Sequence, residues 1–122
     1  PVDVKNPAHW QAIIDGMVSV MHGPRGTARR AGAKADYLIA GKTGTAQLFK
    51  IAQGESVDNA ETPEHLKDHA LFVAFAPADA PQIAVAIVVE NGGSGSAAAA
   101  PIARTIFDNY LLGDEPENPD GH

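Results

Sequence analysis

The sequence predicts an α+β fold in which antiparallel strands are packed by helices. Three observations support this prediction. Near the start, apolar residues recur every three or four positions, as they do on one face of a helix. Three apolar runs in the middle have the length and residue types of strands. A second helical pattern covers residues 97–112.

Length and composition are those of one small globular domain. The chain has 122 residues, of which 44% are apolar and 20% charged. Its net charge of −6, without a basic stripe, argues against a nucleic-acid partner. The absence of cysteine excludes disulfides and thiolate metal sites within the chain. No pattern indicates a cofactor or metal, and no apolar run is long enough to span a membrane.

The first helix is predicted to begin at Asn6-Pro7, with Asn6 as the N-cap, and to end at Gly23-Pro24. The residues before it read as the interior of a longer protein, so we expect the start to be a cut. The apolar residues of this helix share one face: Trp10, Ile13, Ile14, Met17, Val18 and Met21.

A central strand is predicted from Asp36 to about Phe49, and it contains the stretch 41–47, Gly-Lys-Thr-Gly-Thr-Ala-Gln. Alternation along a strand puts Thr43, Thr45 and Gln47 on one face and Lys42 on the other. Gly44 leaves room for another backbone to lie close. Two hydroxyls and a backbone N–H suit a peptide end that carries a carboxylate.

Gly41-Lys42-Thr43 could instead be the last three residues of a phosphate-binding P-loop. That motif requires its first glycine at position 36. That residue is Asp36, and bulky strand formers follow it. An acidic side chain there would repel phosphates, so we set this alternative aside.

The remaining elements follow in order. Residues 50–68 form a long polar connection, either a plain loop or a segment that orders on a partner. Strands are predicted at 69–76 and 82–89, joined by the turn Pro77–Pro81, and an antiparallel meander is the simplest arrangement. The last helix should bury Ile102, Ala103, Ile106, Phe107 and Tyr110. Residues 1–112 would be the folded part, and 113–122 a disordered acidic tail.

A small basic cluster, Arg25, Arg29 and Arg30, precedes the central strand. It can be read as a solvated turn. It can also be read as a group of arginines that attracts an anionic substrate.

The arrangement resembles the class B transpeptidases among the penicillin-binding proteins, which share their fold with serine β-lactamases. Lys42-Thr43-Gly44-Thr45 is similar to the third signature motif of that family. Residues 26–28, 40–47, 68–77 and 88–93 also follow the class B pattern. The likeness is greatest to the penicillin-binding protein 2 group, the elongation enzymes of Gram-negative rods.

The resemblance implies roles for the central strand. Lys42 would tune proton transfer beside the nucleophilic serine. Thr43 and Thr45 would hold the carboxylate of the substrate or of a β-lactam, and the Thr45 N–H would form half of an oxyanion hole. The edge from Gly44 to Gln47 would pair with the substrate backbone. The implied activity is D,D-transpeptidation of peptidoglycan, with a membrane-embedded glycan polymerase as partner, at the periplasmic face of the bacterial inner membrane.

The chain departs from the family at the nucleophile. None of its serines begins S-x-x-K or S-x-N; they are Ser19, Ser56, Ser94 and Ser96. We therefore expect the C-terminal part of a transpeptidase domain, inactive without an upstream half that carries both motifs and, further upstream, the membrane anchor. The alternatives are a non-catalytic module that binds peptide ends along the same strand, and, with less support, a piece of a serine β-lactamase.

Overall fold

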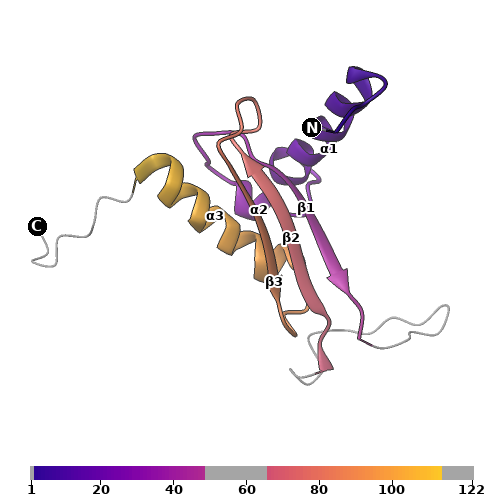
Figure 1. Cartoon of the computed structure of the whole chain (residues 1–122). Coiled ribbons are helices and arrows are strands. Elements are labelled where there is room, and N and C mark those ends of the chain that lie inside the picture. Colours follow the sequence, from indigo (N-terminus) through magenta and orange to yellow (C-terminus); the bar gives the residue numbers. More distant parts are fainter. Residues whose placement is uncertain (1, 49–65, 114–122) are drawn as a thin grey trace, which may run out of the picture.

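A three-stranded antiparallel sheet with helices on one face forms the body of the molecule (Figure 1). The computed structural model describes residues 2–48 and 66–113. The strands are β1 (Ala40–Ala46), β2 (His69–Ala76) and β3 (Ile83–Val89), paired in that order. This confirms the predicted α+β class and the antiparallel meander. Phe49 of the predicted central strand, residues 50–65 of the polar connection and residues 114–122 of the predicted tail lie outside the described residues.

The first helix, α1 (Pro7–His22), has the predicted bounds. The Asn6 side chain accepts a hydrogen bond from the Ala8 N–H at 3.0 Å, and Gly23 caps the other end. Only part of its apolar face is buried within the described residues. Met21 is buried, whereas Trp10 is 50% and Ile13 56% exposed. The reason is positional, because the first turns of α1 extend beyond the sheet (Figure 1).

The central strand begins later than predicted. A short helix, α2 (Arg29–Gly32), comes first, and residues 36–39 pass beside the sheet without joining its ladder. Their backbone groups have other partners: the Ile39 N–H donates to His22 Nε2 at 2.9 Å, and the Leu38 carbonyl accepts from the Ala78 N–H at 2.8 Å. These bonds replace strand pairing, so β1 starts at Ala40.

The core lies between the sheet and the helices. Alternate residues of β2 face the helices and are buried, namely Ala70, Phe72, Ala74 and Ala76. The largest fully buried side chains are Phe72, Phe107, Met21 and Ile39. The opposite face of the sheet is bare within the described residues, with Val73 49% and Val88 63% exposed.

The last helical segment consists of η2 (Gly95–Ala99), α3 (Ala100–Asp108) and η3 (Asn109–Gly113). Two of the five residues of its predicted buried stripe, Ala103 and Phe107, are buried, while Ile102, Ile106 and Tyr110 are exposed. The η2 turn is a π-helix. The buried residues of the segment include the alanines at 99, 100 and 103, so a face of small residues, rather than the one with Ile102 and Ile106, packs on the core.

Candidate functional site

The candidate site is built on β1, which is an edge strand. Within the described residues β1 pairs only with β2, so its outer edge is free. Cross-strand partners share a face of the sheet. Thr43 pairs with Phe72 and Thr45 with Ala70, which places both threonines on the helix-covered side. The predicted alternation is confirmed for these two residues.

Lys42 lies on the opposite, bare face. It pairs with Val73, a residue of that face, and its side chain is exposed. Its Nζ donates to the Thr43 carbonyl at 2.7 Å. No described carboxylate forms an ion pair with it. Gln47 is exposed and lies one residue beyond the end of β1, so it extends the strand without belonging to the ladder.

Two glycines outside the four-residue motif set the position of the strand, and sequence reasoning missed both. A Cβ at Gly41 would lie 2.6 Å from Phe72 Cζ and 3.1 Å from Met21 Sδ. A Cβ at Gly95 would lie 2.3 Å from the Leu71 carbonyl oxygen and 2.8 Å from that of Gly44. The helical layer therefore approaches the motif more closely than any side chain would allow.

Gly44 itself is less constrained on the bare face. A Cβ there would lie 3.2 Å from the Cβ of Leu71, which is tight but is a contact with a side chain rather than backbone. Gly44 thus leaves the bare face of β1 without a side chain at this position.

The end of β1 is held by a cluster of hydrogen bonds from β2 and the turn after β3. Asp68 Oδ1 accepts from the Leu48 N–H at 3.1 Å, and the Asp68 carbonyl accepts from the Gly93 N–H at 2.8 Å. His69 Nδ1 accepts from the Asn91 N–H at 2.9 Å. Asn91 has φ of 53°, a conformation that asparagine tolerates better than most residues. The Asn-Gly-Gly sequence signals such a turn, but its partners are far away in sequence.

The start of β1 is held by His22. Its Nε2 accepts the Ile39 N–H, which requires a ring unprotonated at that nitrogen. Burial of the ring, together with the positive charge of Arg104, lowers the pKa of His22 from its ordinary value of 6.5. The bond that leads the chain into β1 is therefore intact at neutral pH.

These supports leave an exposed lysine, two hydroxyls and a free strand edge available to a ligand. That set can bind an extended peptide by strand addition and can hold a carboxylate. Among the described serines, Ser94 Oγ lies 2.9 Å from Ser96 Oγ, and Lys42 Nζ donates to the Thr43 carbonyl rather than to a described serine. The described ranges contain no group of three or more metal-binding side chains.

Comparison with known proteins identifies the family. Residues 3–108 match the penicillin binding protein transpeptidase domain. The peptidoglycan D,D-transpeptidase MrdA of Haemophilus influenzae is 44% identical, over 89% of this chain and 17% of its own length. MrdA of Escherichia coli K12 is 42% identical, over 98% of this chain and 19% of its own length. The chain thus spans less than a fifth of these curated relatives.

Solved structures agree. Pseudomonas aeruginosa PBP2, in complex with WCK 5153, has a TM-score of 0.76 at 48% identity, covering 93% of this chain and 22% of that one. Helicobacter pylori PBP2, in complex with MreC, has a TM-score of 0.73 at 28% identity, covering 93% of this chain and 19% of that one. With most of its length matched by the family and by these relatives, the chain belongs to the penicillin-binding-protein transpeptidases, on the PBP2/MrdA branch.

Proposed function

We propose that the chain is the C-terminal part of the transpeptidase domain of a peptidoglycan D,D-transpeptidase active in cell elongation. The observation that carries this proposal is the free edge of β1, which presents Lys42, Thr43 and Thr45 in a chain of this family. The substrate is a stem peptide that ends in D-alanyl-D-alanine, and a β-lactam occupies the same site.

The chemistry is acyl transfer through a serine of the upstream half. The serine oxygen bonds to the carbonyl carbon of the penultimate residue, the amide bond to the terminal D-alanine breaks, and the proton passes to the leaving amine. The amine of a second stem then attacks the ester, forms the cross-link and returns a proton to the serine. Lys42 assists these proton transfers.

The rest of the strand binds the substrate. Thr43 and Thr45 donate hydroxyl hydrogen bonds to the terminal carboxylate. The Thr45 N–H stabilises the oxyanion, and the edge from Gly44 to Gln47 pairs with the peptide backbone. Lys42 and Thr45 are thus the catalytic residues of the proposal, and Thr43, Gly44, Thr45 and Gln47 the substrate-binding ones.

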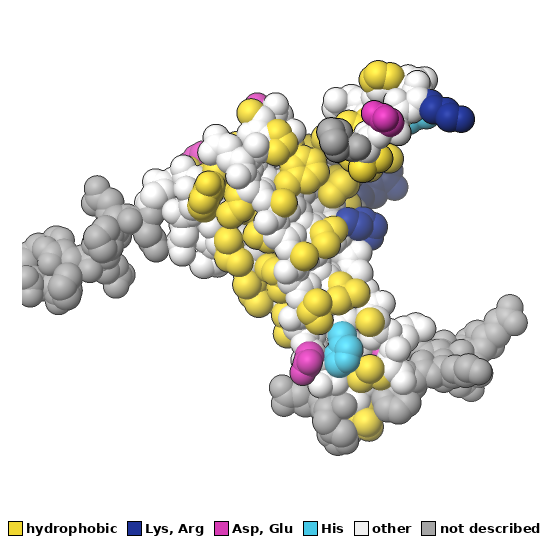
Figure 2. All heavy atoms as spheres, viewed as in Figure 1, with side chains coloured by type: hydrophobic (Ala, Val, Ile, Leu, Met, Phe, Trp, Pro, Cys, Tyr) yellow, Lys and Arg dark blue, Asp and Glu magenta, His cyan; other side chains and the backbone are white. Residues whose placement is uncertain are grey.

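The bare face of the sheet is an argument for the proposed upstream half of the domain, which would cover it. This face is apolar across β2 and β3, and in Figure 2 yellow side chains dominate it. A stable protein rarely leaves so contiguous an apolar surface in water. Because Lys42 lies on this face, a cover that carries the S-x-x-K and S-x-N motifs brings the serine to the lysine.

The whole protein would act at the periplasmic face of the inner membrane, with a membrane-embedded glycan polymerase as partner. The described residues contain no helix that is both long and apolar enough to cross a membrane. The proposal places the anchor upstream.

Penicillin labelling read by intact-protein mass spectrometry tests the assignment. We expect the complete transpeptidase domain to gain one penicillin mass and the isolated chain to gain none. Lys42→Ala should lower acylation by roughly 10²- to 10⁴-fold, the usual effect of losing a general acid–base group. Lys5→Ala, in the exposed segment before α1, is the matched control and should acylate normally.

Thr45→Ala should weaken recognition of the carboxylate while keeping the backbone N–H. Losing a hydrogen bond to a charged group costs about 1.5–3 kcal/mol, so we expect roughly 10- to 150-fold weaker binding. Full acylation rates in both site variants would refute the site. Labelling of the isolated chain would show that one of its own serines is the nucleophile.

The alternative is a non-catalytic module that holds peptide ends along the same edge. The two proposals predict different results when an S-x-x-K segment is joined to the chain. The transpeptidase proposal predicts that the joined protein is acylated by penicillin, and the binding-module alternative predicts no acylation.

A further inference from the structure

A strip of positive charge lies on the helical layer, away from β1. Arg25, Arg29, Arg30 and Lys34 fall within ten residues, and no Asp or Glu occurs between Asp15 and Asp36. The chain as a whole carries a net charge of −6. This basic strip, residues 25–34, is therefore opposite in sign to the net charge of the chain.

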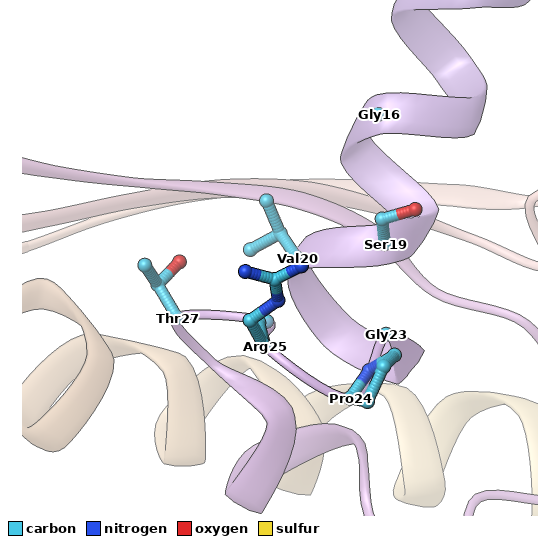
Figure 3. A pocket seen from close by; sticks show the side chains of 8 residues that line it. Gly16, Ser19, Val20, Gly23, Pro24, Arg25 and Thr27 are labelled. Atoms are coloured by element: carbon cyan, nitrogen blue, oxygen red, sulfur yellow. The ribbon is translucent and has the colours of Figure 1, made fainter.

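Four hollows surround the strip. Their volumes are about 330, 450, 260 and 420 Å³, and no carboxylate lines any of them. Arg30 lines three of the four, and Arg29 lines two. In the first hollow, Arg25 extends toward Val20 of α1, with the Thr27 hydroxyl turned toward it (Figure 3). Cations thus border a continuous series of recesses.

The charges of the strip are not neutralised by the described part of the chain. The salt bridge recorded there joins Arg104 and Asp108 and includes none of the four strip residues. Arg29 donates to the Pro24 carbonyl at 2.9 Å, which orients its guanidinium but leaves its charge. Guanidinium groups whose charge is not neutralised by an acidic side chain can bind carboxylates in a bidentate manner.

The strip can remain exposed in the complete protein. The surfaces that need cover are apolar: the bare face of the sheet and the first turns of α1. All four cationic side chains are exposed and stable in water without a partner. The third hollow reaches Ser96, the neighbour of Gly95, whose close approach to Gly44 joins this part of the helical layer to β1.

We propose that the basic strip is a second binding surface for the substrate polymer, where it holds free carboxylates of stem peptides along a peptidoglycan strand. This rests on the proposed function. The cations are distributed over ten residues and four recesses rather than gathered around one point, so they fit an extended ligand with spaced carboxylates better than a single small anion. Such a surface retains the polymer while individual stems enter and leave the edge of β1.

The test is sedimentation of the complete enzyme with purified, insoluble peptidoglycan. The variant Arg29→Gln/Arg30→Gln should bind roughly three- to tenfold more weakly, as expected for losing two exposed charge contacts. A control variant, Lys5→Gln/Gln82→Glu, lowers the net charge by the same two units outside the strip and should bind like the wild type. Thermal midpoints establish that each variant is folded.

Amidation of the free carboxyl groups of the peptidoglycan should reduce wild-type binding to the level of the Arg29/Arg30 variant. The proposal is overturned if this variant binds like the wild type, if the amidated polymer binds equally well, or if the strip instead controls binding to vesicles of anionic phospholipid. Failure of the proposed function would give a different result, because penicillin would then not acylate the complete enzyme.

Discussion

At the residue scale, the geometry of Lys42–Thr45 depends on two glycines that carry no chemistry. Gly41 accommodates the ring of Phe72 and the sulfur of Met21, which are side chains that can shift slightly. Gly95 accommodates backbone oxygens of β1 and β2, which cannot shift without moving the strands. The two positions should therefore respond differently to an added methyl group.

We predict that Gly95→Ala destabilises the complete domain by roughly 3 kcal/mol or more, at the upper end of overpacking costs, and also slows penicillin acylation. The reason is that the new Cβ displaces the Gly44 backbone. Gly16→Ala is the control, since a Cβ there meets nothing within 4 Å and alanine favours a helix by about 1 kcal/mol. Urea unfolding and acylation rates are the measurements, and a Gly95→Ala protein with normal values of both would contradict the packing argument.

A second prediction concerns pH. Because the folded-state pKa of His22 is lowered, the unfolded chain binds more protons as pH falls below the ordinary value of 6.5. The stability that His22 contributes is present above that value and is lost as pH falls through the folded-state pKa. The ring is still accessible to solvent, so the effect should be modest.

His22→Gln offers an acceptor of similar reach that does not titrate. We expect the wild-type domain to lose more stability than this variant between pH 7.5 and pH 5, measured as urea midpoints. His9→Gln is the control, because the His9 side chain has no hydrogen bond within the described residues. Identical pH dependence in the wild type and His22→Gln would rule out the proposed role of the ring.

At the scale of elements, the sequence predicts best where local rules decide. The bounds of α1 follow from Asn6, Pro7 and Gly23, and β2 has the predicted residues 69–76. Prediction fails where distant partners decide. Residues 36–39 stay outside the ladder, where the Ile39 N–H bonds to His22 and the Leu38 carbonyl to Ala78, and α3 buries its alanines rather than Ile102 and Ile106. The local sequence names neither these partners nor the face that packs on the core.

Arg104 and Asp108 of α3 hold α2 and the segment before β1 on the helical side. Its Nη1 donates to the Ala31 and Ala33 carbonyls, both at 2.8 Å, and its Nε donates to Asp108 Oδ1 at 2.9 Å. Tyr37 donates to the same carboxylate oxygen at 2.5 Å. Burial acts to raise the pKa of Asp108, but the hydrogen bonds from Tyr37 and Arg104 and the charge of Arg104 outweigh it, so that pKa is lowered. Burial and Asp108 together raise the pKa of Tyr37.

We predict that Arg104→Met destabilises the domain by about 2–4 kcal/mol, because two carbonyls and a carboxylate lose a charged donor. Arg104→Lys should recover little, since a lysine keeps the charge but not the fork that reaches both carbonyls and Asp108. Arg30→Met, at an exposed arginine of the neighbouring α2, is the matched control. The measurement is the free energy of unfolding in urea. Full recovery by lysine would show that charge alone matters.

For the whole molecule, the sequence identifies the motif strand and its family but not which apolar faces are covered. Trp10, Val73 and Ile102 all lie in patterns typical of buried faces, yet all are exposed here. The periodicity of a sequence indicates that a face is apolar, but it does not indicate what packs on that face. The proposed upstream half supplies an answer for the face that carries Lys42, and that answer can be tested at one residue.

The last prediction is that Val73→Lys has opposite effects on the isolated chain and on the complete domain. Val73 pairs with Lys42 on the bare face and is 49% exposed. In the isolated chain, a lysine there interrupts the apolar surface and should reduce self-association, measured by sedimentation velocity. In the complete domain, the same charge would be trapped beneath the upstream half beside Lys42, so the thermal midpoint and penicillin acylation should both fall. Gln82→Lys adds the same charge at an exposed position outside the sheet and should change neither measurement. If Val73→Lys leaves the complete domain as stable and as reactive as the control, this face is open to solvent in the whole protein, and the serine must reach Lys42 by another route.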